Sequence, residues 1–211
     1  MPRMERKIGV NLYRTFAGQY RISILKELFR KLIHLCSAFV PLFARFSKTL
    51  TLLFLGLALV LYTASEFFRL KGIRIPLVSK VTEAAARKRD ENRFVLGPVT
   101  LVVGIMLSLA IWKIEYATIG IFALAFGDGL ASLFGKLFGR IHIPFTNGKT
   151  AAGSLTCFAA VLVSSFLLLG NSLESLVLAF IAMILEMLPM TDFDNIVLPV
   201  MIGGIAQFLA A

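Results

Sequence analysis

The chain contains few charged residues, few cysteines and few histidines, and each shortage narrows the kind of protein that it encodes. Only 16% of its 211 residues are Asp, Glu, Lys or Arg, whereas 58% are hydrophobic, and the mean hydropathy is +0.84. Soluble domains are considerably less apolar. No polar stretch is long enough to form a separate soluble domain, so we expect a polytopic membrane protein.

The two cysteines and two histidines argue against a zinc site, which usually takes four ligands of these kinds. Cys36 and Cys157 lie in apolar stretches without a partner at metal-ligand spacing, so we expect both to pack in the core. A cleavable signal is not expected either, because the N-terminal PRMERK meets no compact apolar segment and no small-residue cleavage site.

Seven apolar stretches are candidate membrane spans: about 32–46, 48–65, 94–112, 114–134, 151–169, 174–189 and 195–211. Pro41 and Pro98 are expected to interrupt two of them. Residues 1–31 place apolar side chains near helical spacing among basic ones, which is typical of an amphipathic helix on the membrane surface. The predicted fold is therefore all-α, an interfacial segment (1–31) followed by a transmembrane domain (32–211) of about seven helices.

The basic residues predict the orientation of this bundle. With the N-terminus inside, 19 of the 22 Lys and Arg residues fall in the inside segments, which is a strong positive-inside bias. We therefore expect a cytoplasmic N-terminus in an inner membrane and an external C-terminus. The net charge of +10 then reflects an anionic membrane surface, and no nucleic-acid partner is expected.

The same orientation gathers the unusual polar residues in or beside the cytoplasmic segments, which is typical of a functional site. These residues are Arg30, His34, Glu66, Asp128, Lys136, Arg140, Lys149, Glu186, Asp192, Asp194 and Asn195.

Residues 126–154 combine one acid with glycines and three cations. An acid within an apolar helix usually serves a metal, a phosphate site or a structural ion pair, and all three interpretations are open for Asp128. Gly127, Gly135 and Gly139 would let a ligand approach the backbone, or would let helices pack closely.

The segment NGKTAAGS (147–154) resembles a phosphate-binding loop only in part. A Walker A loop needs a glycine five residues before Gly148, where this chain has Ile143, and no β-strand is expected before it. What remains is Lys149 at a helix start, where free N–H groups attract anions. Ser154 would contact phosphate or cap the helix.

The segment EMLPMTDFDN (186–195) holds three acids beside a proline at a membrane boundary. Such a group suits Mg²⁺ bound jointly by protein and phosphates, although Asp192 and Asp194 would also suit a solvated turn. Glu66 and Arg69 would form an i,i+3 ion pair, and His34 would serve the site or only pack.

Taken in order, RKLIH (30–34), SEFFR (65–69), GDGLASLFGKLFG (127–139), KTAAGS (149–154) and EMLPMTDFDN with Pro199 resemble the CTP-dependent lipid kinases, which include dolichol, phytol and yeast-type diacylglycerol kinases. The resemblance implies transfer of the γ-phosphate of CTP to a membrane lipid alcohol. It implies Asp128, Asp192 and Asp194 as holders of Mg²⁺–CTP, and Glu186 as a further ligand or as the base for the lipid hydroxyl. Phosphate binding would fall to Lys136, Arg140, Lys149, Thr150, Ser154 and Gly127, supported by Arg30, His34, Glu66 and Asn195.

Two alternatives stay open. Phosphatidate cytidylyltransferase, which makes CDP-diacylglycerol, shares several of these blocks. Its late KRxxxxKD stretch is absent here, since residues 170–190 contain no Lys or Arg. A transporter or a non-catalytic membrane protein would also have several spans, but its polar residues would lie near the midplane. The glycine-rich faces would permit a homodimer.

Overall fold

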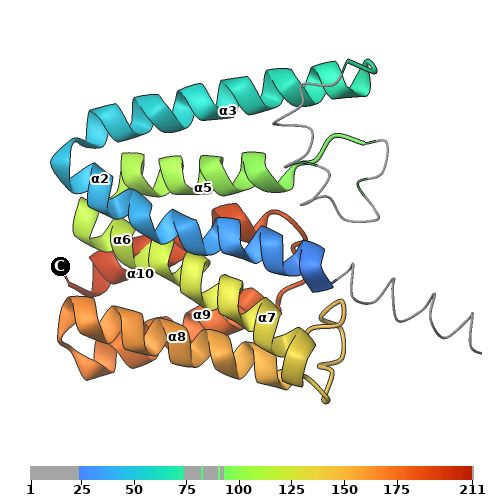
Figure 1. The fold of residues 1–211 in the computed structure, drawn as a ribbon. Helices are drawn as coiled ribbons and strands as arrows, with labels where there is room; N and C mark the ends of the chain where they lie inside the picture. The colour runs from blue at the N-terminus through green and yellow to red at the C-terminus, as the bar shows by residue number, and fades with distance from the viewer. Residues whose placement is uncertain (1–23, 74–81, 83–89, 91–92, 211) are drawn as a thin grey trace, which may run out of the picture.

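A computed structural model describes residues 24–73, 82, 90 and 93–210, and these residues form a bundle of helices (Figure 1). Residues 24–36 are helical and lead into the short 3₁₀ turn η1 (Ser37–Phe39). The elements that follow are α2 (Val40–Phe46), α3 (Lys48–Leu70), α5 (Gly97–Ile111), α6 (Ile114–Phe122), the π-helical η3 (Ala123–Asp128), α7 (Gly129–Phe138), α8 (Ala151–Leu169), α9 (Ser172–Met187) and α10 (Asp194–Leu209). Within the described residues the only β-type pairing is an isolated bridge between His142 and Thr150.

Each predicted span corresponds to helical structure, so the all-α class is confirmed. Three helical runs are long and apolar enough to cross a membrane by themselves: Lys48–Leu70, Ile114–Phe138 and Ala151–Leu169. Gly97–Ile111 and Asp194–Leu209 are apolar but shorter. Most of the predicted interfacial segment 1–31 lies outside the described residues.

Two details of the sequence prediction were wrong. Pro98 does not interrupt a span, because it lies in the first turn of α5, where a proline lacks no helical hydrogen bond. Cys36 is exposed, whereas Cys157 is buried as expected. Cys36 belongs to the peripheral N-terminal helix, where an apolar neighbourhood in sequence does not imply a core position.

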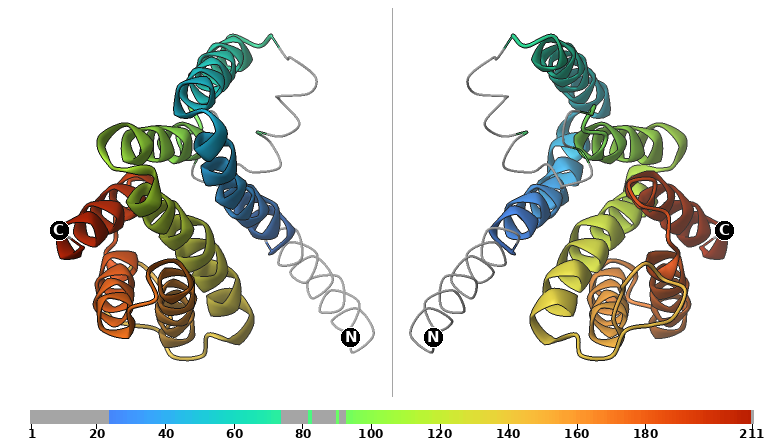
Figure 2. Two further views of the ribbon diagram at one scale, coloured as in Figure 1. Left: turned by 90° about the vertical axis from the view of Figure 1, so that its left-hand side faces the viewer. Right: turned by 90° about the vertical axis from the view of Figure 1, so that its right-hand side faces the viewer.

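The run α6–η3–α7 lies in the middle of the bundle, with α5 and α10 on one side and α8 and α9 on another (Figure 2). Small residues make this position possible. A β-carbon at Gly120 would collide with the backbone of Pro199 and Gly203 on α10. Trp112 also ties this region to α10 through a 2.9 Å hydrogen bond from its Nε1 to the carbonyl of Val200.

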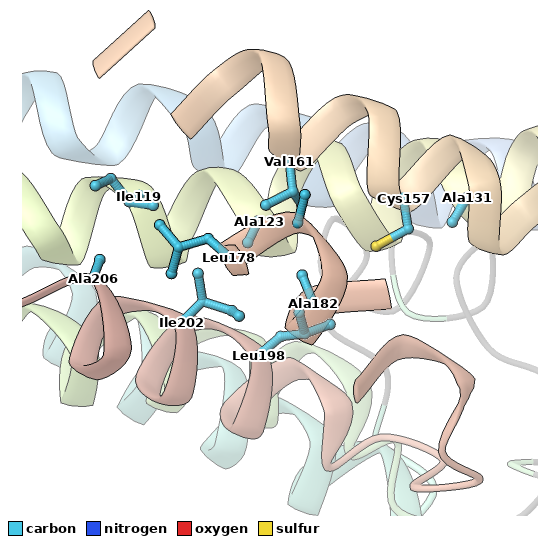
Figure 3. Close-up of a cluster of buried hydrophobic side chains, with 11 residues drawn as sticks. Ile119, Ala123, Ala131, Cys157, Val161, Leu178, Ala182, Leu198, Ile202 and Ala206 are labelled. Carbon is cyan, nitrogen blue, oxygen red and sulfur yellow. The ribbon is translucent and has the colours of Figure 1, made fainter. Parts of the chain in front are cut away.

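The main core lies where this run meets α8, α9 and α10 (Figure 3). Larger side chains such as Leu178, Leu198 and Ile202 alternate with alanines and with Cys157. Large and small residues interdigitate in this way in a well-packed interior. The core fixes the helix ends, and several of these ends lie together on the right in Figure 1: the start of the described chain, the α7–α8 loop and the α9–α10 turn.

Candidate active site

A polar cleft of about 660 Å³ opens at this end of the bundle. Its walls come from helix 24–36, α7, the loop before α8, the end of α9 and the turn before α10. The charged residues that line it are Glu27, Arg30, Lys31, Asp128, Lys136, Lys149, Glu186 and Asp194. The cleft therefore unites the three blocks that the sequence marked as separate motifs.

Asp128 is the last residue of the π-helical segment η3 and is 4% exposed. Its Oδ2 accepts a 2.5 Å hydrogen bond from Lys31 Nζ and lies 3.2 Å from His34 Nδ1. The imidazole nitrogen is not aligned for a hydrogen bond and has no other partner. π-Helical turns are frequent at functional sites, and this one directs the acid of the central helix toward helix 24–36.

Glu27 ties helix 24–36 to α7. Its carboxylate accepts hydrogen bonds from Lys136 Nζ at 2.7 Å, from Ser132 Oγ at 2.8 Å and from Arg30 on its own helix. Glu27 precedes the first predicted span. Burial would raise the pKa of this carboxyl, but the charge of Arg30 and the hydrogen bond from Lys136 outweigh burial and lower the pKa to about 2. Glu27 is thus a fixed anion among the cations of the cleft.

A third pair joins the start of α8 to the end of α9. Lys149 Nζ lies 2.9 Å from Glu186 Oε1 and also donates to the Glu186 carbonyl. Ser154 Oγ donates a 3.2 Å hydrogen bond to Glu186 Oε2. Of the two alternatives for Ser154, phosphate contact or helix cap, the cap is excluded, because Thr150 is the N-cap of α8 and accepts from the N–H of Gly153.

The loop before α8 presents Lys149 at the helix start, as expected. Its backbone folds back on itself, with a 2.9 Å hydrogen bond from Ile143 N–H to the Lys149 carbonyl. Asn147 has a φ of 54° and Gly148 a φ of 85°, which places both in the left-handed region that Asn and Gly tolerate best. The turn brings Asn147, Gly148 and Lys149 to the cleft wall.

The glycines of the site serve helix packing, and some also line the cleft. A β-carbon on Gly135 would lie 2.9 Å from Thr150 Oγ1, and one on Gly153 would lie 2.8 Å from the Ala131 carbonyl. These glycines let α7 and α8 touch, and they line the cleft as well. Gly127 packs instead against Val161 and Cys157 and does not line the cleft.

Six other predicted residues are not part of the wall of the polar cleft: Arg140, Asp192, Asn195, Glu66, His34 and Ser154. Arg140 is exposed and is not part of its wall. Asp192 lines a neighbouring cavity of about 30 Å³, together with His34 and Asn195. Asn195 joins α10 to α5, since its Nδ2 lies 3.0 Å from Thr100 Oγ1. Glu66 pairs with Arg69 at 2.6 Å and accepts from the N–H of Val95, which agrees with the expected ion pair.

The donor chemistry of the cleft fits a divalent cation shared with phosphates. Among the described residues, no three Asp, Glu, His or Cys side chains lie close enough to form a complete metal site. Mg²⁺ does not need one, because it commonly takes one or two carboxylates, water and substrate phosphates. Asp128, Glu186 and Asp194 supply carboxylates around one cleft, so such joint binding is chemically reasonable.

Two important residues were not predicted as site residues, Glu27 and Lys31, although Lys31 lies within the RKLIH block (30–34). Both lie in segment 1–31, whose basic and apolar spacing predicted an amphipathic helix on the membrane surface. Their sequence signal was helical spacing: Glu27, Lys31 and His34 follow one another at intervals of four and three residues, which places them on one face. That face meets α7 and η3.

Comparison with known proteins supports the resemblance that the motifs suggested. The chain is 27% identical to a probable phytol kinase 1 of Glycine max over 95% of this chain and 73% of the relative. It is 29% identical to phytol kinase 1 of Arabidopsis thaliana over 89% of this chain and 66% of the relative. A farnesol kinase of Arabidopsis thaliana is 26% identical over 60% of this chain and 47% of that protein.

All three relatives are described as chloroplastic kinases of an isoprenoid alcohol. The chain spans about two thirds to three quarters of the two phytol kinases and about half of the farnesol kinase. No family model matches the chain, and no solved structure matches it. The chain is thus similar to lipid kinases over most of its length, and the comparisons give no support to the cytidylyltransferase alternative.

Proposed function

We propose that this chain is a membrane-embedded kinase that transfers the terminal phosphoryl group of a nucleoside triphosphate to the hydroxyl of an isoprenoid alcohol. The observation that carries the proposal is the polar cleft, where three carboxylate–lysine pairs from different helices surround one space. Similarity to phytol and farnesol kinases supports the type of acceptor. The resemblance in the motifs supports CTP as the donor.

The cations of the cleft suit the triphosphate. Phosphoryl transfer needs little covalent help from the protein, and catalysis comes mainly from positioning and charge neutralisation. Lys31, Lys136 and Lys149 are each paired with a carboxylate, so they are held in place before the donor arrives. When phosphates enter, these lysines exchange part of their pairing for phosphate oxygens, and Gly148 with the start of α8 offers backbone N–H groups.

Asp128, released from Lys31 by this exchange, and Asp194, which also lines the cleft, suit Mg²⁺. Both would hold the ion together with the phosphates, which leaves Glu186 for the acceptor hydroxyl. Bound Mg²⁺ supplies charge neutralisation at the phosphates that are cleaved. Asp192, which the motifs also assigned to this role, faces the neighbouring cavity and would support the site from there.

Glu186 is the residue best placed to receive the acceptor hydroxyl. It is 5% exposed, it lies one residue before the end of α9, and Ser154 and Lys149 fix both of its oxygens. A carboxylate held in this way can orient a hydroxyl and accept its proton as the new O–P bond forms, while the bridging P–O bond breaks and the nucleoside diphosphate leaves. Lys149 beside it would hold the transferred phosphoryl group.

The cytoplasmic face is the proposed location of the cleft. The positive-inside distribution supports this side, and nucleoside triphosphates occur there. All segments that build the cleft lie at one end of the bundle (Figure 1), which agrees with a site at a membrane boundary.

The test is incorporation of label into lipid by membranes that contain the protein. CTP labelled on the γ-phosphate is offered in parallel with CTP labelled in the base, with phytol, farnesol or diacylglycerol added. We expect γ-label alone to enter a phosphorylated isoprenoid alcohol. Base label in lipid would instead indicate a cytidylyltransferase.

The control is the same experiment with γ-labelled ATP and with membranes that lack the protein. Faster labelling from ATP would overturn CTP as the donor and leave the kinase intact. If neither nucleotide labels lipid while folded protein is present, the kinase proposal is wrong and the non-catalytic alternative returns.

A further inference from the structure

An apolar groove runs along the outer face of the bundle between α8 and α9. It has a volume of about 630 Å³, and only apolar side chains line it, among them Leu155, Phe158, Val177, Phe180 and Met183. Several are largely exposed, with Leu155 at 64% and Phe180 at 55%. In a membrane protein such a surface faces the hydrocarbon of the bilayer, so exposure by itself does not identify an occupant.

The position of the groove beside the polar cleft does point to a particular occupant. Leu155 directly follows Ser154, and Met183 lies one helical turn before Glu186. Ser154 and Glu186 are bonded to each other, and Glu186 lines the polar cleft. α8 and α9 are neighbours joined by the short turn at residues 170–171. The end of the groove at Leu155 and Met183 therefore lies within about one helical turn of this pair, and Glu186 belongs to the cleft wall.

We infer that the α8–α9 groove holds the hydrocarbon chain of the acceptor alcohol, with its hydroxyl at Glu186. The inference rests on the proposed kinase function and adds the path by which the acceptor reaches the site. An isoprenoid alcohol has one polar atom at the end of a long apolar chain. It therefore needs an apolar channel that is open to the bilayer and ends at a carboxylate, and the groove and Glu186 together provide both.

The groove contributes to orientation of the acceptor's hydrocarbon chain more than to its binding affinity. A hydrocarbon chain in the bilayer gains little by moving to an apolar protein surface, because the lipid is equally apolar. Contact with Phe158, Phe180 and Met183 instead restricts the chain to one path, which presents the hydroxyl in a reactive position. Blocking the groove should therefore lower kcat/KM for long chains and leave short chains unaffected.

The first experiment narrows the far end of the groove with Val177→Trp. Val177 lies nine residues before Glu186, or about 13 Å along the helix axis. Only a chain that reaches this far meets the new ring, and we expect kcat/KM for phytol, relative to a short prenyl alcohol, to fall about tenfold. The matched control is Val163→Trp, at an exposed α8 position that does not line the groove.

The outcomes are distinct. A fall in the phytol-to-short-chain ratio for Val177→Trp but not for Val163→Trp supports the groove. An unchanged ratio in a variant that elutes as folded protein overturns it. If Val177→Trp does not accumulate, Leu176→Trp tests the same end of the groove at a more exposed position. If the wild-type protein phosphorylates no alcohol, it is the proposed function that fails.

A second readout does not depend on activity. An isoprenoid alcohol with a photoreactive diazirine at the far end of its chain is irradiated with the protein in vesicles, and the labelled residues are mapped. We expect label on residues 176–181 of α9 or on Phe158, and competition by excess phytol. Label on α3 in place of the groove, or label in the groove that phytol does not compete, would overturn the groove as the acceptor site.

Discussion

Two helical runs of almost equal length and similar hydropathy have opposite places in this molecule. Lys48–Leu70 has 23 residues, and 17% of the residues in its apolar stretch are buried inside the bundle. Ile114–Phe138 has 25 residues, and 67% of the residues in its apolar stretch are buried. Figure 2 shows α3 at the periphery and the second run at the centre. Hydropathy thus identifies a span, but it does not tell whether lipid or protein surrounds the helix.

The size of the side chains accounts for the difference. α3 exposes large apolar residues such as Leu53 and Phe54, which suit contact with lipid chains. The central run places small residues such as Gly120 and Ala123 where other helices cross. In a membrane, helices associate through close packing and polar contacts because lipid is as apolar as the core. Small residues are therefore the sequence signal for the central position.

Each run also carries one buried acid, and the two acids have different partners. Glu66 on α3 is paired with Arg69 of the same helix and with the backbone at Val95. Asp128 on the central run is paired with Lys31 of another helix and faces the polar cleft. A locally satisfied acid is expected to stabilise structure, whereas the acid shared between helices at a cleft is available to a ligand.

The largest expected effect is a loss of activity when Asp128, but not Glu66, is neutralised. We expect Asp128→Asn to reduce lipid phosphorylation by about 10²- to 10³-fold, because it removes a charge that organises phosphates and their counterions. The matched variant Glu66→Gln should keep activity within a few-fold and lower thermal stability. Initial rates with saturating nucleotide and melting curves in detergent measure the two quantities.

The distinction between Asp128 and Glu66 is wrong if the two variants show the opposite activities. An active Asp128→Asn enzyme would remove Asp128 from the site, and an inactive but stable Glu66→Gln enzyme would place Glu66 in it. Size-exclusion profiles must accompany both assays, because Asp128→Asn leaves Lys31 buried without its ion-pair partner.

The next effect concerns packing. Gly120→Ala should destabilise the protein by about 3 kcal/mol or more, since its β-carbon would overlap backbone atoms of α10 that cannot move independently. Gly56→Ala on α3 is the control, because its β-carbon would meet only Met106 Cε, at an ordinary 3.7 Å. It should be neutral or slightly stabilising. Equal melting temperatures for the two variants would contradict the central position of Gly120.

Much of the fold could be predicted from the sequence, because long apolar runs bounded by polar segments leave few alternatives. The predicted 151–169 is the observed Ala151–Leu169, where the Thr150 cap and Gly170 mark both ends. The extent of the central run was harder to predict. It was expected to end at residue 134 but continues to Phe138, with a π-helical segment that no periodicity indicated.

The members of the cleft could be predicted only in part. Asp128 and Glu186 stood out as acids within apolar segments, and Lys136 and Lys149 as cations in the short glycine-rich loop between two predicted spans; all four line the cleft. Glu27 and Lys31 did not stand out, since they lie in a segment rich in charge. Their helical spacing with His34 places them on one face, but it is the packing of helix 24–36 against α7 and η3 that shows this face to be buried in the site.

The smallest effect tests that packing through pH. The folded-state pKa of Glu27 is about 2, below its ordinary value of 4.5. Its stabilising contribution is therefore present above pH 4.5 and is lost as pH falls toward 2. At pH 4 the loss is only about 1 kcal/mol, because the unfolded state has begun to bind a proton and the folded state has not.

Melting temperatures between pH 7 and pH 4, compared for wild type and Glu27→Gln, measure this contribution. Glu27→Gln should remove the part of the acid-induced decrease that comes from this residue, while Glu174→Gln, at a half-buried position in the first turn of α9, should not. Parallel curves for all three proteins would mean that Glu27 is not held by Lys136 and Ser132. Helix 24–36 would then be attached to the central run mainly through Lys31 and Asp128, and the stability of the cleft would depend on the same pair that the proposed reaction must open.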